Sequence, residues 1–353
     1  MKPGVIYGDD YARLVQTCKD EGYALPAVNI VGTNSLNAVL ESAAKNKSDV
    51  IIQLSNGGAQ FFAGKGMEDS FKAKVLGAVS AAQHVHLLAE HYGVCVVLHT
   101  DHADRKLVPW VDALIEEGKK YKDLMGKPLF TSHMLDLSAE PIEENLATSA
   151  EFLKKMTPLG MSIEIELGVT GGEEDGVGGD VDSFDNPSLY TQPEDVMQAY
   201  DLLNPLGHFT VAASFGNVHG VYKPGNVKLR PEILNASQVL LAEKRDVSDK
   251  ELNFVFHGGS GSEKAKIEEA VSYGAFKMNI DTDTQFAFAK PIGDFVKENP
   301  MAFEVQVHPE TGEPFKKKYD PRSWLRKGEE EMVRRLDEAF QDLGSVGKSL
   351  AHR

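Results

Sequence analysis

Val94-Cys95-Val96-Val97-Leu98, followed at once by His99-Thr100-Asp101-His102, contains the pattern on which the fold depends. An apolar run of this length is typical of a strand buried in a parallel sheet, and reactive side chains follow where it ends. His219 and His257 also stand just beyond short β-rich runs. Histidines from the ends of separate strands can converge on one metal ion, and three neutral nitrogen donors suit a tetrahedral zinc with an open fourth position.

Short β-rich runs alternate with longer helical patterns along the chain, which predicts repeated βα units and a parallel sheet. The eight expected strands are residues 27–30, 50–54, 94–98, 129–135, 162–167, 209–213, 253–256 and 275–280. The segments between them are long enough to cross back over such a sheet. Eight units in 353 residues indicate an α/β protein with a single domain over residues 1–353, a closed (β/α)8 or TIM barrel.

Polar side chains stand where the predicted strands end. They are Asn29, Ser55, Asp101 with His102, Asp136, Glu166, Ser214, His257, and Asn279 with Asp281. In a closed barrel all eight strand ends open on one face, where active sites are built from the βα loops. A doubly wound sheet would instead spread them along a crevice, so their concentration favours the barrel.

Two segments depart from a minimal βα unit. Residues 168–189 follow the fifth predicted strand, and their richness in Gly and Asp predicts a long mobile loop that acts as an active-site lid. The alternative is an inert disordered insertion, against which the adjacent Glu173 and Glu174 count. Residues 300–320 and a final helix at about 324–343 indicate a C-terminal arm over about 300–343.

Charge and cysteine content restrict the classes of partner. The formal net charge of −16 argues against non-specific binding to nucleic acid or anionic lipid. Cys18 and Cys95 form neither a CxxC pair nor a disulfide framework, which favours a reducing compartment. The sequence shows no signal-peptide pattern and no apolar run of membrane-spanning length. We therefore expect a cytoplasmic protein with no nucleic-acid or membrane partner.

Five long motifs resemble those of class II, metal-dependent fructose-1,6-bisphosphate aldolases and follow the family's order. They are HTDH at 99–102, EIELGVTGGEEDG at 164–176, ASFGNVHGVYKPGN at 213–226, NFVFHGGSGS at 253–262 and KMNIDTDTQ at 277–285. PAVN at 26–29, QLSNGG at 53–58, YTQPEDV at 190–196 and DPRSWLR at 320–326 extend the likeness to both ends. The resemblance implies a homodimeric zinc enzyme, an aldehyde-lyase of glycolysis and gluconeogenesis. Such an enzyme reversibly cleaves fructose 1,6-bisphosphate into dihydroxyacetone phosphate and glyceraldehyde 3-phosphate.

The resemblance also implies the metal ligands. It makes His102, His219 and His257 the zinc ligands, in agreement with the donor argument above. It makes Glu166 an acidic group beside the zinc that ligates the ion in some states. The alternative for Glu166 is a salt bridge at the rim of the barrel.

Three further residues receive catalytic roles from the resemblance. Glu174 would take a proton from C1 of dihydroxyacetone phosphate in the condensation direction, with Glu173 as the neighbour that stays in solvent. Asp101 would hydrogen-bond the aldehyde oxygen of the second triose and donate its proton, although a carboxylate there could instead orient a ligand histidine. Asn279 would stabilise the enediolate oxygen, because it is neutral.

Glycines after the seventh predicted strand indicate a phosphate site. Gly258 and Ser260 lie in a turn that opens a helix, where backbone N–H groups can meet an anion, and Asp281 with Thr282 follows the eighth strand. The resemblance adds Gly220 and Lys223. It also implies a monovalent cation, Na⁺ or K⁺, held by backbone oxygens of Val218, Gly220 and Gly258.

The phosphate on C6 of the sugar needs a cation elsewhere. The resemblance gives this task to Arg322, with Asn29 and Ser55 as nearby polar contacts. The alternative for Arg322 is a surface ion pair.

Three rival functions remain to be weighed. An aldolase for tagatose 1,6-bisphosphate or another ketose bisphosphate would share the metal and the enediolate chemistry. A barrel metallohydrolase would use the metal to activate water, but the paired glutamates and the phosphate loop count against it. Intact ligands and acid/base residues count against a catalytically silent interaction protein.

Overall fold

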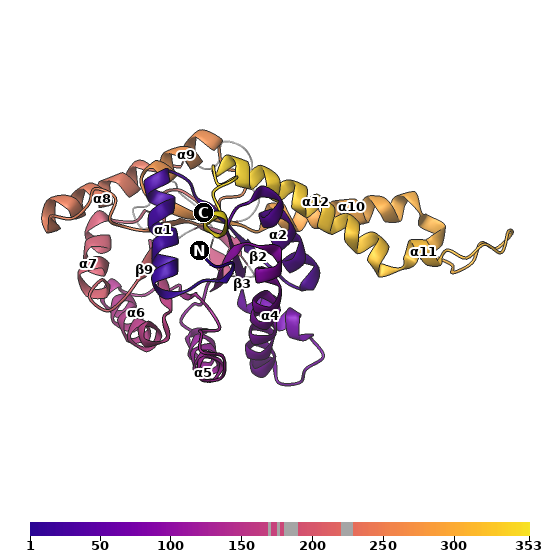
Figure 1. Ribbon diagram of the computed structural model, residues 1–353, viewed down its shortest axis with the longest axis horizontal. Helices are drawn as coiled ribbons and strands as arrows, with labels where there is room; N and C mark the ends of the chain where they lie inside the picture. The colour runs from indigo at the N-terminus through magenta and orange to yellow at the C-terminus, as the bar shows by residue number, and fades with distance from the viewer. Residues whose placement is uncertain (169–170, 175–176, 180–189, 220–228) are drawn as a thin grey trace.

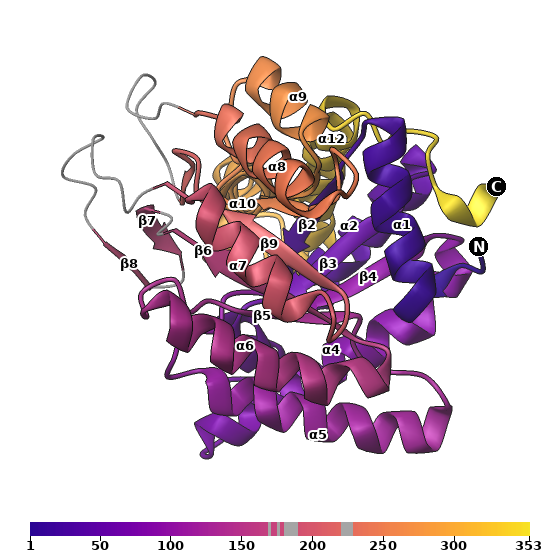
Figure 2. The ribbon, with the colours of Figure 1, turned by 90° about the vertical axis from the view of Figure 1, so that its left-hand side faces the viewer.

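The computed structural model describes residues 1–168, 171–174, 177–179, 190–219 and 229–353, with side chains over 1–168, 190–217 and 229–353. Within these residues eight parallel strands close into a barrel, in the order β4-β3-β2-β12-β11-β9-β6-β5, and β5 pairs with β4 to complete the ring (Figure 2). The strands are β2 (Leu25–Asn29), β3 (Val50–Leu54), β4 (Cys95–Thr100), β5 (Ser132–Leu135), β6 (Ser162–Leu167), β9 (Phe209–Ala213), β11 (Phe254–Phe256) and β12 (Ala275–Ile280). Each overlaps a predicted strand, and the predicted TIM barrel is confirmed.

The interior of the barrel divides into an apolar layer and a polar layer. Side chains alternate along a strand, so residues two apart share a face. Ile51 and Val97 belong to a buried apolar cluster that also contains Leu14. Two residues further along the same strands, Gln53 and His99 are buried and polar. The carboxyl ends of the strands therefore carry a buried polar layer above an apolar base.

Helices surround the barrel, and α1 (Gly8–Glu21) closes its amino-terminal end, where its side chains join the apolar cluster of the interior (Figures 1 and 2). The amino group of Met1 donates to the carbonyl oxygen of Leu350 at 2.7 Å, so the two ends of the chain lie side by side. The helices around the barrel are α2 (Thr33–Asn46), α3 (Asn56–Ala63), α4 (Ser70–Tyr92), α5 (Val108–Met125), α6 (Ile142–Met156), α7 (Pro193–Leu203), α8 (Glu232–Arg245) and α9 (Lys264–Ser272).

The segment expected as a lid loop contains two short strands. The strands β7 (Gly171–Glu174) and β8 (Val177–Gly179) pair antiparallel, and β7 pairs in parallel with β10 (Val218–His219). The expectation of loop throughout 168–189 is thus corrected at these residues, because a glycine-rich backbone can satisfy its N–H and C=O groups by strand pairing. At the base of the segment, Thr191 Oγ1 accepts from the backbone N–H of Ser214 at 2.7 Å.

The C-terminal arm begins earlier than expected, with α10 (Thr282–Glu298), and ends with α12 (Pro321–Asp342). These two helices run side by side away from the barrel, and the short α11 (Lys316–Tyr319) lies near the far end (Figure 1). Gly328 lets the helices approach closely, since a Cβ there would stand 2.8 Å from the carbonyl oxygen of Phe288. The arm is anchored to α2 by hydrogen bonds from Asn46 to Asp337 at 2.6 Å and from Arg326 to Glu41 at 2.7 Å.

Of the helices in the described part of the chain, none combines the length and the apolar composition that a bilayer crossing requires.

Candidate active site and metal centre

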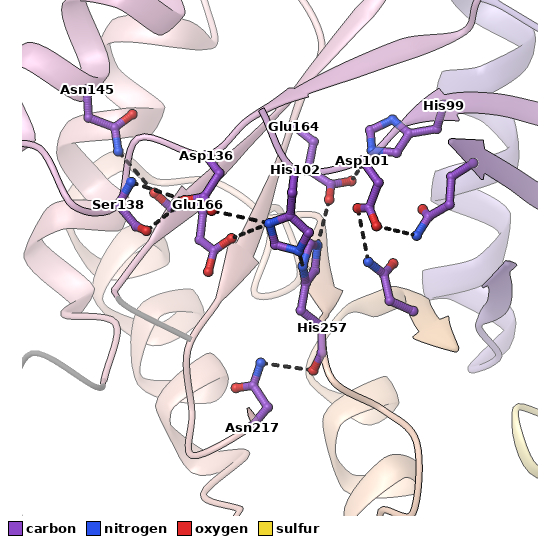
Figure 3. A network of polar contacts seen from close by, with 12 residues as sticks. His99, Asp101, His102, Asp136, Ser138, Asn145, Glu164, Glu166, Asn217 and His257 are labelled. Atoms are coloured by element: carbon purple, nitrogen blue, oxygen red, sulfur yellow. Dashed lines mark hydrogen bonds and ion pairs between the residues drawn. The ribbon is translucent and has the colours of Figure 1, made fainter. Parts of the chain in front are cut away.

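The chain turns sharply where β4 ends, and this turn places two adjacent side chains, Asp101 and His102, in the polar layer. His102 has a φ of 31°, in the left-handed region that non-glycine residues seldom adopt. Figure 3 shows Asp101 and His102 within one network of polar contacts that also contains His257, which follows β11. Strain of this kind is concentrated at functional sites, so the turn marks this end of the barrel as a candidate site.

Two imidazole rings meet nearly at right angles at the centre of the network. His102 Nε2 lies 2.9 Å from His257 Nδ1, and the rings are nearly perpendicular, at 87°. Each outer nitrogen faces a carboxylate: His102 Nδ1 lies 3.2 Å from Asp136, and His257 Nε2 lies 2.9 Å from Glu164. Because ionised carboxylates only accept hydrogen bonds, they hold the protons on the outer nitrogens. When both rings are neutral, as metal ligation requires, their inner nitrogens direct lone pairs to the same region.

Converging nitrogen lone pairs suit a metal ion. Tetrahedral zinc binds histidine nitrogen at about 2.0–2.1 Å, which separates two such nitrogens by about 3.3 Å, close to the 2.9 Å between the rings. Glu166 lies beside them, with a carboxylate oxygen 3.6 Å from His102 Nδ1. Ligand atoms of Asp101, His102 and His257 lie within 4.8 Å of one another, as do those of His102, Asp136 and Glu166. His219 belongs to β10, but its side chain lies outside the described part of the chain.

The carboxylate of Asp101 is held by three side-chain amides. Asn29 and Gln53 donate to one oxygen at 3.1 and 2.9 Å, and Asn279 donates to the other at 3.2 Å. Burial acts to raise the pKa of Asp101, but attraction to His102 and His257 in their protonated forms, attraction to Lys277 and the hydrogen bond from Asn29 outweigh it and lower the pKa to about 2. Asp101 is therefore ionised at neutral pH and acts as a hydrogen-bond acceptor.

The network also contains residues to which we gave no role from the sequence. Gln53, Glu164 and Lys277 were not singled out, and Asp136 was named only as a polar residue at a strand end. Glu164 and Lys277 form a buried ion pair, with Lys277 Nζ 2.7 Å from a Glu164 oxygen. The period of a strand offered a signal, because Glu164 is two residues before Glu166 and Lys277 is two residues before Asn279. Each shares the inward face of its strand with a predicted site residue.

The turn after β11 packs directly against the end of β12. The backbone N–H of Gly259 donates to the carbonyl oxygen of Asn279 at 3.2 Å, and a Cβ at Gly259 would stand 2.5 Å from Cγ of Met278. Gly258 has a φ of 61°, and Ser260 follows in the same turn. The structure thus brings this predicted phosphate loop next to Asn279.

The other predicted substrate contacts lie at strand ends or outside the described residues. Ser55 caps α3 and accepts from the backbone N–H of Gly58 at 3.1 Å, while Asp281 and Thr282 stand where β12 leads into α10. Gly220 and Lys223 lie outside the described residues, as does the side chain of Glu174 in β7. Of the three residues predicted to hold a monovalent cation, Gly258 is fully described, Val218 is described only as backbone in β10, and Gly220 is not described.

Arg322 is not joined to this network in a single chain. It begins α12 on the projecting arm, its side chain is 90% exposed, and its guanidinium donates to Asp320 at 2.7 Å. The structure thus shows Arg322 in a surface ion pair, which was the alternative to a phosphate contact in the sequence analysis.

Comparison with known proteins identifies the family. The sequence profile described as "Fructose-bisphosphate aldolase class-II" matches residues 9–348. The chain belongs to the class II fructose-bisphosphate aldolase family. It is 56% identical over 353 residues to fructose-bisphosphate aldolase of Campylobacter jejuni, covering 99% of this chain and 98% of that protein. It is 54% identical over 351 residues to fructose-bisphosphate aldolase class 2 of Escherichia coli strain K12, covering 98% of this chain and 97% of that protein.

A solved structure agrees with this assignment to the class II family. The crystal structure of fructose-bisphosphate aldolase from Campylobacter jejuni superimposes with a TM-score of 0.89 at 55% sequence identity, covering 99% of this chain and 98% of that one. The family predicted from the motifs is confirmed. Class II aldolases are metal-dependent, and the clustered His, Asp and Glu side chains of this chain are of the type that holds a metal ion.

Proposed function

We propose that this protein catalyses the reversible aldol cleavage of fructose 1,6-bisphosphate to dihydroxyacetone phosphate and glyceraldehyde 3-phosphate, in glycolysis and gluconeogenesis. The observation that carries the proposal is the pairing of His102 with His257 beside Asp101, at the carboxyl ends of the strands, in a chain that matches class II aldolases over almost its full length. In a TIM barrel this face is where catalytic residues gather.

His102, His219 and His257 would hold a zinc ion, with Glu166 as an additional ligand in some states. Bound zinc supplies a Lewis acid that polarises the ketone carbonyl and stabilises the enediolate left by cleavage of the carbon–carbon bond. Support comes from the 2.9 Å approach of two imidazole nitrogens and from the carboxylates behind each ring. Asp136 and Glu164 fix the rings with their inner nitrogens toward the ion.

Asp101 moves the proton of the sugar's C4 hydroxyl. As a carboxylate it accepts this proton during cleavage, and by reversal it returns the proton to the aldehyde oxygen during condensation. Glu174 moves the proton at C1 of dihydroxyacetone phosphate. Asn279, a neutral donor at the end of β12, stabilises the enediolate oxygen, since one of its two amide N–H groups suffices for Asp101.

The phosphate of dihydroxyacetone phosphate binds at Gly258, Ser260, Asp281 and Thr282, together with Gly220 and Lys223. A monovalent cation, Na⁺ or K⁺, accompanies it on backbone oxygens of Val218, Gly220 and Gly258. The second phosphate would bind to Arg322, with Asn29 and Ser55 as further polar contacts, although within a single chain Arg322 lies on the arm and pairs with Asp320. Support for the first site comes from the close packing of Gly259 on Asn279, which brings the backbone of the glycine-rich turn beside the end of β12.

We further propose a homodimer that works in the cytoplasm. The projecting arm exposes apolar side chains that a second copy would cover: Met301, Phe303, Val305 and Val307 are between 39% and 47% exposed. Analytical ultracentrifugation of the wild type should give a dimer, and Val305→Glu with Val307→Glu should weaken it. A monomeric wild type would contradict this part of the proposal. Both cysteines are free and buried, which suits a reducing compartment.

A coupled assay with purified protein tests the substrate. Release of glyceraldehyde 3-phosphate and dihydroxyacetone phosphate should be faster from fructose 1,6-bisphosphate than from tagatose 1,6-bisphosphate. Faster cleavage of the tagatose isomer would move the assignment to the rival aldolase. Release of inorganic phosphate without cleavage would favour the metallohydrolase.

A further inference from the structure

A buried ion pair lies in the polar layer of the barrel, directly behind the two histidines. Lys277 Nζ donates to both carboxylate oxygens of Glu164, at 2.9 and 2.7 Å. Each residue is only 2% exposed. They come from β12 and β6, so the pair spans the interior of the barrel. The inward positions of most TIM barrels are filled by bulky branched apolar side chains, and two opposite charges there are unusual.

Stability does not explain why these charges are kept. Removing two charges from water costs several kcal/mol per ion, and a buried pair can often be replaced by apolar residues of similar volume without loss of stability. The inward layer below, which includes Ile51 and Val97, is apolar. A reason other than stability must therefore favour the pair of Glu164 and Lys277 at this level.

The carboxylate of Glu164 has a further contact that supplies such a reason. Its Oε1 lies 2.9 Å from His257 Nε2, on the side of the ring opposite His102. A carboxylate accepts, so it keeps the proton of His257 on Nε2 and leaves the lone pair of Nδ1 directed at His102 Nε2. Its other oxygen faces His99 Nε2 at 3.6 Å.

Lys277 fixes the carboxylate that fixes the ring. By donating to both oxygens it opposes rotation of the carboxylate and compensates its charge in the buried interior. Lys277 thereby also holds Glu164 in contact with Nε2 of His257, the ring nitrogen that faces away from His102. The order of contacts is therefore Lys277, Glu164, His257 and then the region where the two imidazole lone pairs converge.

We propose that Lys277 and Glu164 are positioning residues that hold His257 as the Nε2–H tautomer, with Nδ1 ready to bind the metal. The inference rests on the proposed function in taking His257 as a zinc ligand. Partners of this kind behind a ligand histidine change metal affinity by about 10- to 100-fold. Glu164→Gln should therefore weaken zinc binding by about that factor, because a neutral amide can either donate or accept and no longer selects one tautomer.

Zinc affinity is measured on the full chain by competition with a chromophoric chelator, without substrate. The double variant Glu164→Gln/Lys277→Met removes both charges and should fold without an unpaired buried ion, with the same loss of zinc affinity. Lys19→Met is the matched control, because Lys19 is also a buried lysine, 4% exposed, but donates to backbone carbonyls of Lys250 and Glu251 at the other end of the barrel. The control should keep the zinc affinity of the wild type.

Nitrogen NMR of the histidine rings in metal-free protein gives a second readout that a merely structural role would not change. The wild type should show His257 protonated on Nε2, and the double variant should show a mixture of tautomers. A wild-type His257 protonated on Nδ1, or a folded double variant with unchanged zinc affinity, would overturn the inference. A wild type that binds zinc but does not cleave fructose 1,6-bisphosphate would instead contradict only the proposed function.

Discussion

The carboxyl groups of Asp101 and Glu174 serve different carbon atoms of the sugar in this account. Asp101 is held among three amide donors beside the two histidines, where the aldehyde half of the substrate would lie. Glu174 is in β7, within the segment that follows the fifth barrel strand. Because the two groups come from different elements, their contributions can be separated by substitution.

Glu174→Gln should keep zinc and still bind dihydroxyacetone phosphate, yet slow exchange of the C1 proton with solvent by about 10²- to 10⁴-fold, because only the base is removed. Asp101→Asn should retain that exchange but lose cleavage and condensation, since its partner is the aldehyde. NMR in deuterated water without aldehyde separates the two variants. Normal exchange in the Glu174 variant would assign the base elsewhere, with Glu173→Gln as the next variant to measure.

His219→Ala should reduce bound zinc to well below one ion per chain, as measured by elemental analysis after dialysis. Two remaining histidines leave an incomplete site, and metal affinity depends on ligand number. His208→Ala is a suitable control, because His208 lines a cavity at the amino-terminal end of the barrel. Full zinc occupancy in the His219 variant would show that another residue supplies the third ligand.

The strands of the barrel were largely predictable from the sequence. The side-chain contacts between strands across the barrel were not. Residues 50–54, 162–167, 209–213 and 275–280 were predicted as strands and are found with the same bounds, because apolar runs between turn signals are local patterns. The contact of Glu164 with Lys277 joins residues 113 positions apart, and nothing local in either strand specifies it. The extension of the arm through α10 was also missed, because an amphipathic helix shows the same apolar period whether it packs on the barrel or on another helix.

The close approach of two helices predicts how glycine substitutions change the free energy of unfolding. Gly77 of α4 packs on α3 so tightly that a Cβ would stand 1.8 Å from the carbonyl oxygen of Ala59. Gly77→Ala should lower the free energy of unfolding by about 1–3 kcal/mol, because backbone must move. Gly118 of α5 has open space at the same position, so Gly118→Ala should raise it by about 0.5–1 kcal/mol through helix propensity. The free energies of unfolding are measured by urea titration. Equal changes in the Gly77 and Gly118 variants would contradict this account of the packing.

A half-buried histidine in α4 gives a pH dependence of stability. Burial lowers the pKa of His86 from its ordinary 6.5 to about 4, although Nε2 donates to the carbonyl oxygen of Leu129 at 3.0 Å. As pH falls below 6.5, His86 takes up a proton in the unfolded chain but stays neutral in the folded chain until about pH 4. The free energy of unfolding therefore falls as pH falls from 6.5 to 4.

His86→Gln should flatten that dependence, because glutamine can donate to Leu129 without titrating. His91→Gln, at an exposed position of the same helix, should leave the slope between pH 6.5 and 4 as in the wild type. The measurement is the free energy of unfolding in urea at several pH values. An unchanged slope in the His86 variant would show that other groups cause the acid sensitivity.

At the scale of the whole molecule, a closed barrel collects side chains from eight strands at one end and an arm extends the chain beyond it (Figure 1). The family and the fold were predictable from the sequence because the motifs fall at strand ends. The position of Arg322 relative to the histidines was not predictable, because its sequence motif does not indicate the direction in which α12 projects. In a single chain Arg322 pairs with Asp320 instead of facing the histidines.

Metal dependence of cleavage tests the central claim most directly. Prolonged chelation should abolish cleavage of fructose 1,6-bisphosphate, and added zinc should restore it, because His102, His219 and His257 would hold a Lewis acid that replaces a lysine Schiff base. Treatment with borohydride in the presence of substrate should leave the enzyme active. Persistence of cleavage after metal removal, with borohydride trapping a covalent lysine adduct, would contradict the account.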